Sequence, residues 1–400
     1  MSALIKPSRD WPAEIILLGS SVFGYVALNA LSPVLPEIEK HFSGEVGAEF
    51  WSKAILTVAG VAMLIAPFSG WLARRLGGPR CLMSACYVTV LVIGVAGAYA
   101  PNLASLILSR FVVGVAGALL VTLAISLIGD RYEGRARELR IGINLAIGGA
   151  LIGLVVPIAG VLGDTFGWRA AFGIHLIAIP FLFAALGAPS LSSFRHNPSK
   201  TASVRGPVGP MLFCVTLGLL CGAIALSIPV YMPFRAREVG VKGASITGLL
   251  FTLMASFGVL SSFCFGLLRA KFSVSLILFV AFSLWAVGIV ILAIGHTVPV
   301  LMLGAFIIGI GGGQSQPSIF SMVATVSPPP NLTRNNGMIK SVFYIGPFIA
   351  TSLLGLLWHH EAARLSLLTL GGISVAMAIC ALIAATGLTE KWRKPFARTN

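Results

Sequence analysis

A single arginine lies within a long apolar stretch of the sequence. Arg110 is surrounded by small and apolar residues from about Leu103 to Ile128, a run long enough to cross a bilayer as a helix. A guanidinium keeps its charge there, at a cost of about 2.5–3.5 kcal/mol at mid-membrane. Residues this costly usually face a protein interior or a wet cavity, although the side chain could also snorkel to the nearer surface. We expect Arg110 to contribute to a binding cavity.

Other polar side chains recur on single faces of apolar runs. Ser21, Tyr25 and Asn29 are four residues apart and share a helix face. We expect Tyr25 and Asn29 to line a cavity, the alternative for Asn29 being a hydrogen bond between helices.

Three later apolar runs contain further candidate cavity residues. Gln314 and Gln316 follow three glycines and precede a proline, and an interruption of this kind in a membrane helix favours a binding site. Lys340 and Tyr344 share a face on the next run, and Tyr231 belongs to a shorter polar stripe. The alternatives are a kink satisfied by neighbouring helices and, for Lys340, a side chain that snorkels.

Carboxylates are absent from the middle of every apolar run. All 13 Asp and Glu residues lie at the ends of runs or between them. Proton relays in membranes commonly use Asp, Glu or His, so the candidates for proton coupling are Glu37, Asp130, Asp164 and His175. A cavity with cationic side chains and no acid would repel a desolvated cation. We therefore expect an anionic, zwitterionic or neutral amphiphilic substrate.

The elements that position these residues are predicted to be membrane-spanning helices. Of 400 residues, 57% are hydrophobic and 10% are charged, against about 25% charged residues in soluble proteins. Continuous apolar runs indicate helices, because the strands of a membrane barrel would alternate in polarity. The predicted fold class is an all-α membrane protein with twelve spans, at residues 14–34, 52–73, 80–99, 103–128, 141–163, 168–188, 209–232, 244–268, 273–295, 299–325, 338–358 and 364–387.

The basic residues predict the orientation. Outside Arg110, 20 of the lysines and arginines fall on the side of the N-terminus and seven on the other side. The positive-inside rule therefore places both termini in the cytoplasm. This rule also accounts for the net charge of +15, so no nucleic-acid partner is expected. The first run is too long for a cleaved signal peptide and is interpreted as an uncleaved anchor.

The longest polar break divides the runs six and six. Residues 189–208 are rich in serine, proline and basic residues and are predicted to form a cytoplasmic linker. The predicted domains are an N-terminal six-helix bundle at 1–188 and a C-terminal six-helix bundle with a basic tail at 209–400. Two similar halves are typical of transporters with internal repeats, whose binding site lies between the halves near the bilayer midplane. A channel fits this layout less well.

The loop after the second run carries a recognisable motif. It reads Gly70-Trp71-Leu72-Ala73-Arg74-Arg75-Leu76-Gly77-Gly78-Pro79-Arg80 and resembles the loop signature of the major facilitator superfamily. Glycines permit a tight turn there, and arginines anchor the inner face. The family's usual aspartate falls on Arg74. A weaker match to this motif occupies the same place in the second half and supports an internal repeat. It reads Gly266-Leu267-Leu268-Arg269-Ala270-Lys271.

Two further segments extend the resemblance. Arg110 with Gly114 and Gly117 looks like the fourth-helix motif of the superfamily. The fifth run is similar to the fifth-helix motif of the 12-helix drug/proton antiporter branch, with Val156 in place of a usual glycine. The residues to which the resemblance assigns conformational roles are Gly70, Arg74, Arg75, Gly77, Gly153, Pro157 and Gly160.

The resemblance implies a function. It indicates a multi-pass transporter of the bacterial inner membrane, not an enzyme, that exports drugs or small metabolites by alternating access, with protons as the candidate coupling ion. Asn29 stands where related exporters carry an aspartate, so proton coupling would need another group. The alternative is an importer or an uncoupled facilitator of an organic anion or neutral solute. The expected partners are a small-molecule substrate and the lipid bilayer. The sequence has no metal-ligand spacing or phosphate loop, so no metal or cofactor is expected, and we expect a monomer.

Overall fold

The computed structural model describes residues 10–194, 208–328, 331–357 and 362–386. Within these residues all regular structure is helical and no strand occurs. Twelve helical segments are long and apolar enough to cross a membrane, which confirms the predicted fold class and number of spans. Most of the predicted linker, at 195–207, and the basic C-terminal tail lie outside the described residues.

The N-terminal half supplies six spans, four of which consist of two or more consecutive helical elements. Prolines explain the breaks at Pro33, Pro36 and Pro67, because proline lacks the N–H that a continuous helix needs. The elements are α1 (Trp11–Gly19), α2 (Val22–Asn29), η1 (Ser32–Val34), α3 (Leu35–His41), α4 (Ala48–Ala62), η2 (Met63–Phe68), α5 (Ser69–Arg75), α6 (Pro79–Ala96), η3 (Gly97–Tyr99), α7 (Leu103–Arg131), α8 (Gly134–Phe166), η4 (Trp168–Ile177), α9 (Ala178–Leu186) and η5 (Pro189–Leu191).

The C-terminal half supplies the other six spans, mostly as long single helices. They are α10 (Val208–Glu238), α11 (Ala244–Phe263), α12 (Phe265–Lys271), α13 (Val274–Ile294), α14 (Val298–Val326), α15 (Leu332–Leu357) and α16 (Ala362–Thr386).

The helix α14 differs from the sequence-based expectation. The predicted interruption around Gln314 and Gln316 is wrong, because α14 runs unbroken through Pro317. The preceding glycines have a packing role instead. A Cβ on Gly311 would lie only 2.6 Å from the carbonyl oxygen of Ala281 in α13, so a larger residue would force the two helices apart.

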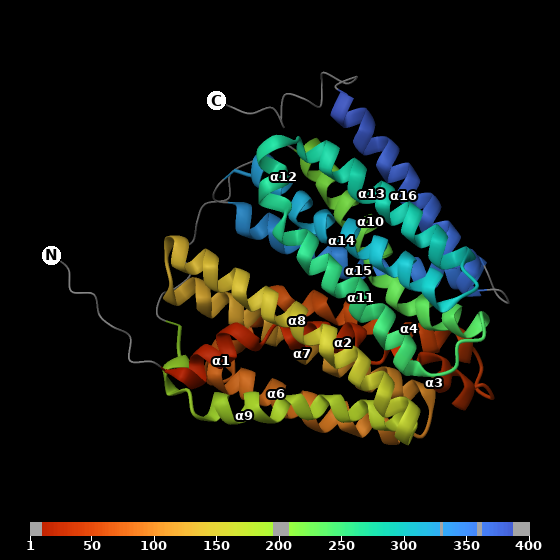
Figure 1. The fold of residues 1–400 in the computed structure, drawn as a ribbon. Coiled ribbons are helices and arrows are strands. Elements are labelled where there is room, and N and C mark those ends of the chain that lie inside the picture. Colours follow the sequence, from red (N-terminus) through yellow and green to blue (C-terminus); the bar gives the residue numbers. More distant parts are fainter. Residues whose placement is uncertain (1–9, 195–207, 329–330, 358–361, 387–400) are drawn as a thin grey trace.

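The two halves meet at one end of the molecule and diverge at the other (Figure 1). They lie together near α3 and α4, and they separate toward the end where α1 begins. Small residues permit the close approach of the halves. A Cβ on Gly160 in α8 would lie 2.6 Å from the carbonyl oxygen of Ala244 in α11, and one on Gly60 in α4 would lie 2.5 Å from that of Tyr344 in α15.

Candidate functional site

A large vestibule lies between the halves on the side where they diverge. Its volume is about 1520 Å³, and its lining includes Arg74, Asp130, Arg137, Phe194 and Asn336. Several of these residues lie near helix ends, such as Arg74 in the last turn of α5 and Asp130 in the last turn of α7. The vestibule therefore opens on the side of the molecule that the basic residues assign to the cytoplasm.

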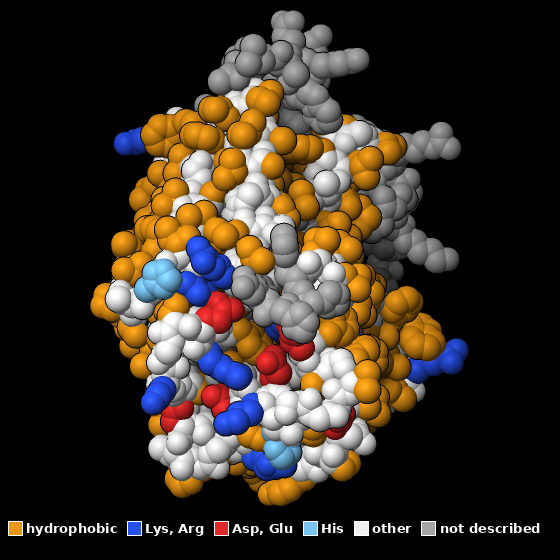
Figure 2. Space-filling model, turned by 90° about the vertical axis from the view of Figure 1, so that its right-hand side faces the viewer, with side chains coloured by type: hydrophobic (Ala, Val, Ile, Leu, Met, Phe, Trp, Pro, Cys, Tyr) orange, Lys and Arg blue, Asp and Glu red, His pale blue; other side chains and the backbone are white. Residues whose placement is uncertain are grey.

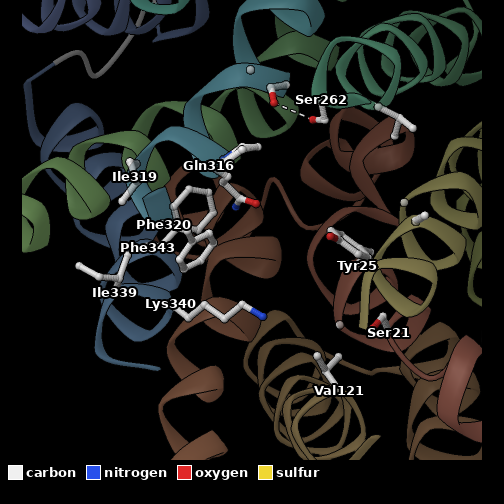
Figure 3. A pocket seen from close by; sticks show the side chains of 18 of the residues that line it. Ser21, Tyr25, Val121, Ser262, Gln316, Ile319, Phe320, Ile339, Lys340 and Phe343 are labelled. Carbon is white, nitrogen blue, oxygen red and sulfur yellow. Dashed lines mark hydrogen bonds between the residues drawn. The ribbon is translucent and has the colours of Figure 1, made fainter. Parts of the chain in front are cut away.

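A smaller chamber continues the vestibule toward the middle of the protein. Its volume is about 420 Å³. The two cavities share Val121, Phe320, Lys340 and Tyr344, so these residues form a neck between them. Figure 3 shows the Lys340 side chain reaching into the cavity from α15, with Tyr25 on the opposite wall.

The chamber has a distinctive charge pattern. Among the described residues that line it, Lys340 is the one charged side chain, and none is a carboxylate. No hydrogen bond or ion pair joins Lys340 to another described residue. Neutral polar groups come from Ser21, Tyr25, Ser262, Gln316 and Tyr344, and the rest of the wall is mostly apolar or glycine. The chamber is thus an apolar pocket with one unpaired ammonium group.

Half of the predicted cavity residues converge on this chamber. Tyr25, Gln316, Lys340 and Tyr344 line it, although they come from α2, α14 and α15. Sequence reasoning missed the apolar wall, such as Phe320. Its signal is the spacing of four residues between Gln316 and Phe320, which places them on one face of α14.

Three other predicted cavity residues, Asn29, Gln314 and Tyr231, are buried and do not line the chamber. Asn29 donates from Nδ2 to the carbonyl oxygen of Tyr25, at 3.2 Å. Gln314 donates from Nε2 to Oγ of Ser261, at 2.8 Å. Tyr231 is fully buried, and its ring centre lies 5.9 Å from the ammonium of Lys53 in α4.

Arg110 belongs to α7, its side chain contacts α6 and η4, and it lines neither cavity. Its side chain is buried, with one guanidinium nitrogen 3.0 Å from Nε2 of His175 and another 3.5 Å from the carbonyl oxygen of Gly94. Arginine can only donate, so Nε2 of His175 is the acceptor. Nδ1 of His175 then donates to the carbonyl oxygen of Phe172, at 2.8 Å. This geometry corresponds to a neutral histidine, and it places Arg110 inside the bundle rather than at a cavity wall.

The proton-coupling candidates lie outside the small chamber. Asp130 lines the vestibule, Glu37 is exposed at the end of the first span, and His175 is buried against Arg110. Asp164 lies at the opposite end of the molecule from the vestibule mouth and contacts the other half. A coupling role for any of the four stays a prediction.

The end of the molecule opposite the vestibule is closed by contacts between the halves. Asp164 at the end of α8 accepts hydrogen bonds from the backbone N–H groups of Ala244 (2.5 Å) and Ser245 (2.9 Å), the first two residues of α11. Arg237 in α10 donates to the carbonyl oxygen of Pro36, at 3.2 Å. Figure 2 shows this face, where acidic and basic side chains intermingle. The chamber is therefore accessible from one side.

A polar cluster beside the vestibule connects helices of the N-terminal half. The hydroxyl of Tyr132 donates to Glu14, at 2.5 Å, and the guanidinium of Arg140 lies 3.3 Å from the same carboxylate and 3.8 Å from the Tyr132 ring centre. Burial, followed by the hydrogen bond to Glu14, raises the pKa of Tyr132 above its ordinary value. Tyr132 consequently stays a neutral hydrogen-bond donor at physiological pH.

The residues of the loop motif lie at the same end. Gly77 and Gly78 have φ angles of 80° and 101°, which form the tight turn between α5 and α6. Arg74 lines the vestibule, and the guanidinium of Arg75 lies 4.8 Å from the ring centre of Trp71. Among the described residues, no group of three or more His, Cys, Asp and Glu side chains is placed to hold a metal ion.

Comparisons with known proteins agree with this architecture. A profile of the Major Facilitator Superfamily matches residues 17–268 and 212–399. The quinolone resistance protein NorA of Staphylococcus aureus (strain MRSA252) is 32% identical over 142 residues, which are 34% of this chain and 35% of NorA. Monocarboxylate transporter 11 of Mus musculus is 28% identical over 167 residues, which are 41% of this chain and 37% of that protein.

The chain thus matches little more than a third of the length of these two relatives. The likeness to solved structures extends much further along the chain. A crystal structure of the peptide transporter POT in complex with sulfate has a TM-score of 0.78 at 13% identity, with 98% of this chain and 96% of that chain covered.

Proposed function

The chain belongs to the Major Facilitator Superfamily, and from this premise we propose that it is a secondary transporter, not an enzyme, that exports a small organic amphiphile across a bacterial inner membrane. The proposed substrate is an organic anion, or a zwitterion or neutral amphiphile that presents an electron-rich group to Lys340. The proposed substrate site is the chamber lined by Tyr25, Gln316, Lys340 and Tyr344.

The unpaired ammonium group in an apolar chamber carries this proposal. A charge in a poorly hydrated site interacts strongly with other charges, so Lys340 would repel a cation and attract an anion. No carboxylate of the described lining offsets it. The volume of about 420 Å³ falls within the roughly 300–1,000 Å³ of small-molecule sites, and the apolar wall suits an aromatic or aliphatic body.

The asymmetry of the two ends supports loading from the cytoplasm. The vestibule leads to the neck from the side that the positive-inside rule assigns to the cytoplasm. The opposite end is held by the contacts of Asp164 and Arg237. In alternating access, the two halves would rock about the chamber until these contacts part and the vestibule closes.

The names of the two relatives agree with separate parts of the proposal. One is a quinolone resistance protein, and export of a drug is one route to resistance. The other is called a monocarboxylate transporter, and a monocarboxylate is an organic anion.

Transport of permanently charged probes by the purified chain in proteoliposomes tests the proposal. We expect saturable uptake of naphthalene-1-sulfonate, which is a monoanion. We expect little uptake of trimethyl(1-naphthyl)ammonium, a cation with the same naphthalene ring. Loss of one partner of a desolvated charge pair costs about 2–5 kcal/mol, so Lys340→Gln should raise KM for the anion roughly 30-fold or more. Lys271→Gln is the matched control, because Lys271 is exposed on α12 and lines neither cavity. Equal or faster transport of the cation would contradict the proposal.

A further inference from the structure

The charge of the chamber bears on the energy source of transport. We propose that the membrane potential, rather than a proton gradient, drives export of a monoanion through this protein. The inference rests on the proposed function. Its starting point is that Lys340 is the one charged group among the described residues lining the chamber.

The charge that moves differs between the loaded and the empty protein. With a monoanion bound beside Lys340, the charges in the chamber cancel, so the loaded step moves no net charge across the field. When the chamber is empty, the ammonium charge remains, and its return toward the cytoplasm is favoured by a potential that is negative inside. One cycle therefore exports one negative charge, and the potential acts on the return step.

Among the candidates for proton coupling, the described contacts identify no group placed to carry a proton in exchange for the substrate. Neutral His175 accepts from Arg110 and donates to the backbone, so a second proton on Nε2 would face the guanidinium directly. Asp164 is engaged by the N-terminus of α11 in this state. Glu37 is exposed at the closed end, and Asp130 belongs to the vestibule rather than to the chamber. Among the described residues that line the chamber, the titratable groups are Lys340 and the phenols of Tyr25 and Tyr344, and none is a carboxylate or a histidine.

The experiment imposes one gradient at a time on proteoliposomes of the full chain. A potassium gradient with valinomycin sets the potential at equal pH, and a pH gradient is set separately with the potential clamped at zero. The probe is naphthalene-1-sulfonate, which is ionised at every accessible pH. The sign of the driving force does not depend on the orientation in which the protein inserts.

We expect accumulation of the probe when the interior is positive and exclusion when it is negative. The limit is a roughly 50-fold ratio, the value for one charge crossing about 100 mV. The pH gradient alone should produce no accumulation. Lys340→Arg should keep the dependence on potential, and Lys271→Gln should behave as the wild type.

Three results would overturn the inference. Accumulation driven by the pH gradient at zero potential would show that proton movement is coupled to movement of the anion, with Lys340 as the first group to examine. Accumulation unaffected by the sign of the potential would show that the cycle moves no charge. Both results leave the proposed function standing, because the anion is still transported. If the anion is not transported under any gradient, the proposed function and this inference fail together.

Discussion

Replacement of Asp164 by alanine is expected to favour the state that is open at the end of the molecule opposite the vestibule, which we call the outer end after the predicted orientation. Asp164 belongs to the N-terminal half, and its two oxygens accept the first two backbone N–H groups of α11 in the other half. This carboxylate therefore acts as an N-cap supplied from another helix. The cap can exist only while the outer ends of α8 and α11 are together, so its whole contribution stabilises the closed outer end.

The size of the effect follows from the capping geometry. Loss of a capping residue costs about 0.5–2 kcal/mol, and the negative charge is further favoured by the positive end of the helix dipole. Asp164 is exposed, so water can replace it, and we expect about 1 kcal/mol. This value corresponds to a roughly fivefold shift of the conformational equilibrium, since about 1.4 kcal/mol is tenfold.

Distances between spin labels measure this equilibrium directly. Labels on Val46 and Lys242, which are exposed on opposite halves at the outer end, should show a larger population of long distances in Asp164→Ala than in the wild type. The background would lack the exposed cysteines Cys81, Cys264 and Cys380. Thr165→Ala is the matched control, because its hydroxyl bonds within α8 to Val161. Identical distance distributions for Asp164→Ala and the wild type would refute a latching role.

Two further predictions concern the buried arginine and the neck. Gly94→Ala should lower the free energy of unfolding in detergent by about 1–3 kcal/mol, because the added Cβ would lie 2.5 Å from the His175 ring. Gly173→Ala is the control and should be neutral, because a Cβ at Gly173 would meet no atom within 4 Å. An unchanged melting temperature for Gly94→Ala would argue against tight packing around Arg110. Val121→Trp should block uptake of naphthalene-1-sulfonate at the neck, whereas Val88→Trp, on an exposed face of α6, should not. Normal uptake by Val121→Trp would place the route elsewhere.

The sequence was sufficient for the fold because the bilayer restricts the alternatives. Only helices satisfy their own backbone hydrogen bonds across hydrocarbon, so long apolar runs such as residues 103–128 indicate spans with little ambiguity. The details within a span were harder to predict. The glycines before Gln314 suggested a broken helix, yet they pack α14 against its neighbours without interrupting it.

The chamber could be predicted only in part, for a geometric reason. Periodicity places polar residues together on one helix face, but it does not give the neighbour that the face meets. Tyr25 reaches the chamber, whereas Asn29, one turn further along the same span, bonds back to the backbone of Tyr25. The cap formed by Asp164 depends on a helix about 80 residues away in the chain, and no local pattern signals it.

Arg110 and Lys340, two of the cations inside the spans, show why burial of charge alone does not identify a functional site. Arg110 is almost completely buried, but its guanidinium reaches the ring nitrogen of His175, the carbonyl oxygen of Gly94 and the face of Phe172. These neutral partners stabilise the charge within the bundle although Nε of Arg110 has no hydrogen-bond partner, and the side chain lines neither cavity. Lys340 is half-buried and has no partner among the described residues, and it projects into a space of molecular size. An unpaired charge beside an apolar cavity is stabilised most by a ligand of opposite charge, because water hydrates it poorly there. For this reason the substrate is expected at Lys340 and not at Arg110, which was the more conspicuous residue in the sequence.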